Sequence, residues 1–352
     1  MGYIRSFDGL RGIAVLIVVF FHAGRLGGGF LGVDLFFALS GFLITSILVA
    51  EYESCGGISL GAFYARRVLR LMPALFAMLS FYVVITLVLN QHATQHLTAA
   101  AFAAGYVMNW VIAFHLGPVG FIAHTWSLGM EEQFYLLWPA LLLLALSWAG
   151  RPAAVGVGIV LFAASAIWRS YLAAHGASWE RTYCGFDTGT DALFAGCVFA
   201  LVDLSPTMLS FMRSSWYIPT ALISGFCAVA AYGAHWMQFW GLTVFAVSAA
   251  WLVRMLSASG GNFLETVLEW TPLRFLGRIS YGVYLWHLPI LWLLVFAHLP
   301  ERLIILAILP LSVTVAFVSH IVIEQPFLRL KVRQFSRVKR YEAAPGITPA
   351  GL

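Results

Sequence analysis

Residues 9–50 of the chain read GLRGIAVLIVVFFHAGRLGGGFLGVDLFFALSGFLITSILVA. This stretch holds two apolar runs, at 9–26 and 30–50, joined by a turn of three consecutive glycines. Each run is close to the roughly 20 residues that an α-helix needs to cross about 30 Å of hydrocarbon. Two such runs in tandem predict a pair of membrane-spanning helices, which sets the class of the whole fold.

The same apolar character extends over all 352 residues, of which 61% are hydrophobic and 10% are charged. Soluble domains carry about 25% charged residues, so this composition excludes a soluble enzyme, a disordered chain and a disulfide scaffold. The four cysteines lack the spacing of metal ligands and are interpreted as structural, and no metal site is expected. The net charge of +5 is attributed to basic cytoplasmic loops and not to nucleic-acid binding.

Eleven apolar stretches are candidates for membrane spans, and residues 98–115 form the weakest. The stretches lie at 9–26, 30–50, 68–90, 98–115, 133–149, 153–172, 187–203, 216–233, 238–256, 279–298 and 302–323. If 98–115 does not cross, all but Arg25, Arg169, Arg181 and Arg302 of the 20 basic residues lie on the cytoplasmic side. If it does cross, only eight of the 20 lie there, which disagrees with the positive-inside rule.

The sequence therefore predicts an all-α polytopic membrane protein with about ten transmembrane helices and both termini in the cytoplasm. Residues 91–132 are then expected to form a re-entrant segment on the outer side, where irregular backbone is tolerated around a cavity. Residues 1–330 are expected to form the integral-membrane domain, and 331–352 a short basic cytoplasmic tail.

Arg11 and His22 are ionisable residues inside the first apolar run. Eleven residues make close to three helical turns, so both side chains lie on one face, about 16 Å apart along the axis. An intramembrane histidine indicates a functional site, but a packed histidine bonded to a carbonyl explains the sequence equally well. Asp34, near the outer end of the next run, is placed to pair with His22 or Arg25.

Arg66, Arg67 and Arg70 stand at the cytoplasmic mouth of the third span. Arg67 and Arg70 share a helix face and can clamp one polyanion. The three arginines can equally fix the topology or contact anionic membrane lipid, so both interpretations stay open.

Two further segments are dense in side chains that bind sugars or exchange protons. Residues 124–135 contain Trp126, Glu131, Glu132 and Tyr135, and residues 280–289 contain Tyr281 and His287. A carboxylate in a first helical turn can simply face the helix dipole, and aromatic residues can simply mark a membrane interface.

Together these pieces resemble the acyltransferase-3 family, integral-membrane enzymes that O-acylate lipopolysaccharide O-antigens, exopolysaccharides, nodulation factors and macrolides. The matching motifs, in chain order, are Asp8-Gly9-Leu10-Arg11 with His22, 32–37 with 40–44, Arg66-Arg67-x-x-Arg70-x-x-Pro73, 126–128 with 131–135, 280–289 and Glu324-x-Pro326. One departure is Gly189, which stands where many members carry an arginine. The chain resembles the stand-alone members and not those fused to an extracellular esterase-like domain.

The resemblance implies transfer of an acyl group, usually acetyl from acetyl-CoA, to a hydroxyl of a glycan or lipid-linked glycan at the bacterial inner membrane. The expected catalytic residues are His22 as general base with Arg11, Asp34 and Glu132, of which Asp34 or Glu132 orients the imidazole. Acyl-CoA is expected to bind at Arg66, Arg67 and Arg70. The expected substrate-binding residues are Trp126, Glu131, Tyr135, Tyr281 and His287.

The main alternative is a transporter or exporter of a lipid-linked or small substrate that uses the same intramembrane histidine and arginine. The sequence has no repeated halves with paired broken helices, which argues against it. The oxyanion donor, an acyl-histidine intermediate and the oligomeric state stay open at this level.

Overall fold

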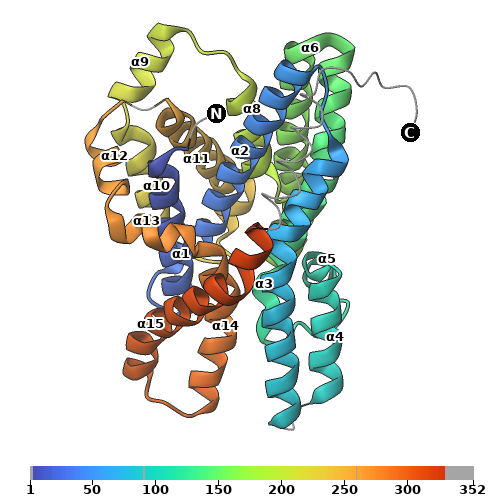
Figure 1. Cartoon of the computed structure of the whole chain (residues 1–352), viewed down its shortest axis with the longest axis vertical. Coiled ribbons are helices and arrows are strands. Elements are labelled where there is room, and N and C mark those ends of the chain that lie inside the picture. The colour runs from blue at the N-terminus through green and yellow to red at the C-terminus, as the bar shows by residue number, and fades with distance from the viewer. Residues whose placement is uncertain (1–2, 90–91, 259, 330–352) are drawn as a thin grey trace.

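The computed structural model describes residues 3–89, 92–258 and 260–329, and all regular elements in these ranges are helical. Figure 1 shows them as a bundle elongated along one axis. The first half contains α1 (Arg5–His22), η1 (Gly27–Leu31), α2 (Gly32–Cys55), α3 (Leu60–Val88), α4 (Ala93–Ala104), α5 (Met108–Ala113), η2 (Gly120–Thr125) and α6 (Trp126–Ala174). The second half contains α7 (Trp179–Cys184), α8 (Asp191–Leu201), α9 (Pro206–Ser214), α10 (Tyr217–Val229), η3 (Met237–Gly241), α11 (Leu242–Ser257), α12 (Phe263–Leu268), α13 (Thr271–Arg278), α14 (Ser280–Phe296), α15 (Glu301–Ser319) and η4 (His320–Glu324).

Five helical stretches are long and apolar enough to cross a membrane, and a sixth results if α13 and α14, bent by 73°, form one span. The all-α prediction is confirmed, and these lengths and compositions identify an integral membrane protein. The expected count of ten spans is not reached by this criterion. The physical reasons are that α8 and α10 have only 11 and 13 residues, and that α1 carries Arg5, Asp8 and Arg11 within 18 residues.

Helix α6 is divided by a backbone break, which explains how 49 residues fit into the bundle. Gly150 adopts φ 71° and ψ −158°, a conformation closed to other residues, and the preceding Ala149 is also non-helical. The break falls between the apolar stretches predicted at 133–149 and 153–172.

The weakest predicted span, 98–115, is not a continuous helix. Helix α4 has 12 residues, and α5 has six. Tyr106, between them, has φ 55°, which interrupts the helical path. Neither piece has the roughly 20 residues required to cross the bilayer.

Helices α2 and α8 pack with their backbones in close approach. A methyl group added at Gly41 would collide with the carbonyl oxygen of Leu193, and one added at Gly196 would collide with that of Ala38. Helices in lipid lack a hydrophobic driving force for association, and small residues at their interface permit the close van der Waals packing that stabilises it instead. Gly41 therefore serves helix packing.

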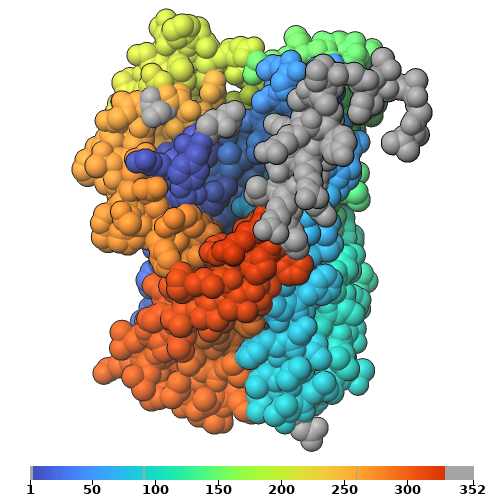
Figure 2. Space-filling view, in the orientation of Figure 1, coloured from blue at the N-terminus to red at the C-terminus, as the bar shows by residue number. Residues whose placement is uncertain are grey.

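Helix α15 crosses the front of the molecule diagonally, over the helices of the interior (Figure 1). Figure 2 shows its side chains covering this face between the lower parts of α14 and α3. The segment η4, which continues α15, contacts α3. The C-terminal helices thus close the bundle on the side of α3.

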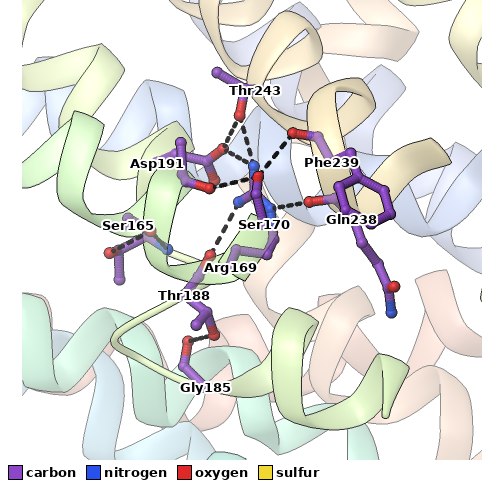
Figure 3. Close-up of polar contacts among 11 residues, drawn as sticks. Ser165, Arg169, Ser170, Gly185, Thr188, Asp191, Gln238, Phe239 and Thr243 are labelled. Carbon is purple, nitrogen blue, oxygen red and sulfur yellow. Dashed lines mark hydrogen bonds and ion pairs between the residues drawn. The ribbon is translucent and has the colours of Figure 1, made fainter. Parts of the chain in front are cut away.

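A fully buried ion pair joins α6 to α8. Nη2 of Arg169 lies 2.8 Å from Oδ2 of Asp191, and the two side chains are 0% and 1% exposed. The guanidinium also donates to the carbonyls of Gln238 and Thr188 and to the hydroxyl of Thr243, as Figure 3 shows. These bonds satisfy the guanidinium and tie η3 and α11 to the same point, which gives the pair a structural role. The tail predicted at 331–352 lies outside the described residues.

Candidate functional site

A cavity of about 350 Å³ lies between α1, α2, α3, α6 and α14, and we call it the basic cavity. Four arginines line it, against two carboxylates, those of Asp8 and Glu131. The arginines are Arg11, Arg67, Arg70 and Arg278. Most of the apolar residues in the lining come from α2. The cavity therefore combines positive charge with an apolar wall.

Arg67 and Arg70 reach this cavity, whereas Arg66 lies outside its lining. The guanidinium carbon of Arg67 lies 4.9 Å from the centroid of the Tyr135 ring and 5.5 Å from that of Phe63. Within the described ranges, Arg70 has no hydrogen bond or ion pair. Arg66 instead pairs with Glu51 at 3.5 Å. The structure thus brings two of the three expected arginines to this cavity, because adjacent residues point to different sides of a helix.

Arg11 enters the basic cavity from α1. Its Nη1 lies 3.2 Å from Oδ1 of Asp8, one turn earlier, and Asp8 also accepts a hydrogen bond from Tyr3. The carboxylate neutralises part of the charge and holds the guanidinium at the wall. Arg11 therefore belongs with Arg67 and Arg70.

The two tyrosines predicted to bind substrate also lie at the basic cavity. The Tyr135 hydroxyl lies 2.5 Å from Oγ of Ser40 and 3.0 Å from Oε1 of Glu131. The Tyr281 hydroxyl donates to the carbonyl of Leu71 at 2.9 Å, which ties α14 to α3. Tyr281 thus has a structural bond in addition to its place in the wall.

A second cavity, of about 570 Å³, contains His22, and we call it the histidine cavity. Its wall is rich in rings, including those of Trp126, Tyr183 and Tyr232. Residues 111–124 supply another part of the wall. Glu180 is the single formally charged side chain in the lining, apart from any protonated histidine. This cavity therefore suits an uncharged, ring-containing ligand better than an anion.

The two cavities share Val33 and Tyr284 in their walls. The Tyr284 hydroxyl donates to the carbonyl of His124 at 2.9 Å and lies 2.6 Å from Oγ of Ser127. Ser127 belongs to the basic cavity and His124 to the histidine cavity. The two cavities therefore adjoin at Val33 and Tyr284.

His22 ends α1 at the histidine cavity, where its ring is held by hydrogen bonds at one nitrogen. Nδ1 lies 3.0 Å from the carbonyl oxygen of Val18 and 3.2 Å from Nε2 of His287. Across the described part of the chain, Nε2 of His22 has no hydrogen bond, and this atom is not buried. A nitrogen at a cavity with no protein partner can exchange a proton with a ligand.

The two carboxylates expected to orient His22 have other positions. Asp34 is buried and accepts a hydrogen bond of 2.9 Å from the Tyr183 hydroxyl. Glu132 lines neither cavity. Within the described residues His22 bonds only to Val18 and His287, so the expectation for Asp34 and Glu132 is corrected. A pattern of local spacing does not reveal His287, which lies 265 residues away.

His287 was expected to bind substrate, but the structure places it in contact with Nδ1 of His22 and away from both cavities. Its side chain is 0% exposed and lines neither cavity. Sequence reasoning also gave no role to Tyr284, His124 or Glu180. Tyr284 lies one turn before His287 in the motif at 280–289, so this motif could have identified it. Glu180 lies in no motif, so the sequence offered no way to identify it.

No cysteine in the histidine cavity is suited to act as a nucleophile. Cys184 lies in its wall and is free. Burial, with a smaller contribution from Glu180, raises the pKa of the Cys184 thiol, so the thiolate is disfavoured. Among the residues that the structure describes, no group of three or more His, Cys, Asp or Glu side chains is arranged to hold a metal ion.

The fold and the site thus define a polytopic helical membrane protein with a basic cavity beside a histidine-containing one. The sequence profile of the acyltransferase-3 family, described as an acyltransferase domain, matches residues 4–321. The chain belongs to this family. The resemblance carried by the motifs is thereby confirmed.

The relatives of the chain include named acetyltransferases. The peptidoglycan O-acetyltransferase OatA of Listeria monocytogenes is 35% identical over 314 residues, which are 83% of this chain and 50% of the relative. The O-acetyltransferase OatA of Staphylococcus aureus is 30% identical over 369 residues, which are 95% of this chain and 60% of the relative. The chain thus spans about half the length of the curated relatives it matches. No solved structure matches it significantly.

Proposed function

We propose that the chain is an O-acetyltransferase of a bacterial inner membrane that transfers acetyl from acetyl-CoA to a hydroxyl of a peptidoglycan-type glycan. The observation that carries this proposal is the pair of cavities that share Val33 and Tyr284, one basic and the other containing His22. The donor is assigned to the basic cavity and the acceptor to the histidine cavity.

The charges of the basic cavity support coenzyme A as the donor. Arg67 and Arg70 offer guanidinium groups without carboxylate partners in the described residues, and such groups bind phosphate through paired charge-assisted hydrogen bonds. A volume of 350 Å³ is at the lower end of the roughly 300–1,000 Å³ of small-molecule sites. We therefore assign the pantetheine arm to the cavity and the nucleotide to its mouth.

The ring-rich wall of the histidine cavity supports a sugar acceptor. Trp126 contributes an indole to this wall, and Glu180 offers a carboxylate that accepts hydrogen bonds from hydroxyl or amide groups. The name of the Listeria monocytogenes relative refers to peptidoglycan, and for this reason we propose a peptidoglycan-type acceptor in place of the lipopolysaccharide or exopolysaccharide expected from sequence.

The proposed reaction uses His22 as general base. Nε2 of His22 takes the proton of the acceptor hydroxyl while the hydroxyl oxygen attacks the carbonyl carbon of the thioester. The tetrahedral intermediate then breaks its carbon–sulfur bond, and the imidazolium returns the proton to the leaving thiolate. The products are an acetyl ester and free coenzyme A. A neutral imidazole with a free lone pair can take up the first proton, and the imidazolium so formed can give it back.

The proposed topology keeps the features expected from the basic residues. A cytoplasmic location of both termini places the basic cavity toward the cytoplasm, which supplies acetyl-CoA. Residues 91–132 then lie on the outer side, where α4 and α5 are too short to cross. The acceptor reaches the histidine cavity from that side.

Detergent-permeabilised membranes that contain the full chain test the proposal, with acetyl-CoA labelled in the acetyl group and muramidase-released peptidoglycan fragments as the acceptor. We expect label on the glycan, released by mild alkali as expected for an ester. Movement of fragments across sealed vesicles without modification would favour the exporter alternative. Absence of transfer with both substrates present would contradict the proposed function.

A further inference from the structure

His287 forms two hydrogen bonds from a fully buried position, and their partners differ in kind. Its Nδ1 lies 2.6 Å from the carbonyl oxygen of Tyr284, and its Nε2 lies 3.2 Å from Nδ1 of His22. The side chain is 0% exposed. A buried ring with a partner at each nitrogen has a fixed orientation.

The carbonyl partner determines which nitrogen of His287 carries the proton. A carbonyl oxygen only accepts hydrogen bonds, so Nδ1 of His287 must be the protonated nitrogen. In a neutral imidazole the other nitrogen then holds a lone pair. Nε2 of His287 is therefore an acceptor directed at His22.

The same reasoning assigns the proton of His22. Nδ1 of His22 faces two acceptors, the Val18 carbonyl and Nε2 of His287, so it must carry the proton. A doubly protonated His287 would turn Nδ1 of His22 into an acceptor and set its lone pair against the Val18 carbonyl. The neutral arrangement is the one in which every contact is a hydrogen bond.

We propose that His287 is a positioning residue that holds His22 in the Nδ1–H tautomer, so that Nε2 of His22 keeps its lone pair at the histidine cavity. This inference rests on the proposed function, in which Nε2 is the base. His287 thus occupies the place in which many hydrolytic sites use a carboxylate to orient a histidine. It replaces the role expected of Asp34 or Glu132.

The arrangement also accounts for the charge that forms during the reaction. When Nε2 of His22 accepts the proton of the acceptor hydroxyl, Nδ1–H still donates to Val18 and His287. The proton then passes from Nε2 to the sulfur of the leaving thiolate. His287 stays neutral throughout, and its contribution is to orient the ring and accept one hydrogen bond.

The kinetic test uses the full chain in detergent-permeabilised membranes with labelled acetyl-CoA and muramidase-released peptidoglycan fragments. His287→Phe and His287→Met remove the acceptor nitrogen, whereas His287→Gln keeps a donor and an acceptor. His96→Phe is the matched control, because His96 is also a buried ring hydrogen-bonded to one partner, Tyr82, and lines neither cavity.

We expect kcat of the Phe and Met variants to fall at least about tenfold, and by less than the roughly 10²–10⁴-fold that a general base contributes. The KM for acetyl-CoA should stay within about twofold, His287→Gln should regain a large part of kcat, and His96→Phe should retain wild-type kcat. Wild-type kcat in folded His287→Phe or His287→Met would overturn the inference, as would a Gln variant no better than Phe.

A tautomer measurement on the wild-type protein tests the inference without an activity assay. Nitrogen-15 NMR of the wild-type protein with labelled histidine, assigned by loss of a signal in His22→Gln, should show His22 protonated at Nδ1 and unprotonated at Nε2. Protonation of His22 at Nε2 would overturn the inference. If the tautomer is as expected but wild-type protein transfers no acetyl, the proposed function fails and the positioning contact stands.

Discussion

The guanidinium carbon of Arg67 lies 4.9 Å from the centroid of the Tyr135 ring, at the wall of the basic cavity. Stacking against this ring and that of Phe63 fixes the guanidinium plane. The N–H groups at its edge have no carboxylate partner among the residues described, so they are available to an anion. Arg67 is therefore expected to contribute to binding of the anionic donor.

Arg67→Ala should raise the KM for acetyl-CoA about 10- to 100-fold, because a hydrogen bond between charged groups contributes about 1.5–3 kcal/mol. The KM for the glycan should change little. Steady-state kinetics with each substrate varied in turn measures the difference. Arg66→Ala, which lies outside the cavity and pairs with Glu51, should have a smaller effect. A larger rise in the glycan KM than in the acetyl-CoA KM would move the donor site elsewhere.

Trp126→Ala should raise the KM for peptidoglycan fragments roughly tenfold, which corresponds to about 1.4 kcal/mol of lost ring contact. The KM for acetyl-CoA should be unchanged, because Trp126 lines the histidine cavity alone. Trp148→Ala is the control, since that side chain is 85% exposed. Equal effects of the two substitutions on the glycan KM would argue against an acceptor in this cavity.

Gly41→Ala should destabilise the protein by about 1–3 kcal/mol or more, because the added methyl group collides with the Leu193 carbonyl across the α2–α8 contact. Gly156→Ala is the matched control, as a helical glycine with open space around it. This control should be neutral or stabilising by up to about 1 kcal/mol. Thermal unfolding in detergent compares them, and equal melting temperatures would contradict the close packing.

Asp191→Ala should destabilise the protein by about 3–5 kcal/mol, since it leaves the Arg169 guanidinium buried without its partner. Arg169→Ala should have a similar effect for the same reason. The double variant should be less destabilised than the sum of the two, because each single change already breaks the pair. Additive losses in melting temperature would show that the ion pair does not couple α6 to α8.

Structural features that depend on residue spacing within one segment could be predicted from the sequence. The spacing of Arg67 and Arg70 placed them on one face, and the structure directs both to the basic cavity. Polar residues and Gly117-Pro118 marked 98–115 as the weakest span, and the structure divides it into two short helices. Both features depend on residues close together in the chain, so the spacing and type of these residues predict them.

Contacts between distant segments were not predictable in the same way. Arg11 and His22 share a helix, yet they line different cavities, which adjoin at Val33 and Tyr284 from other helices. His287 reaches His22 across 265 residues, and Asp34 bonds to Tyr183 across 149 residues. No periodic pattern relates such positions, so Asp34 and Glu132 were given a role that we propose for His287 instead.

The general-base assignment of His22 is the central claim, and the rate of acetyl transfer by His22→Ala tests it most directly. The assay measures label moved from acetyl-CoA to peptidoglycan fragments by permeabilised membranes with matched amounts of wild-type and variant protein. We predict a fall of about 10²–10⁴-fold in kcat, the contribution of a general base, with the KM for acetyl-CoA unchanged. A His22→Ala protein that keeps a substantial fraction of the wild-type rate would contradict the account.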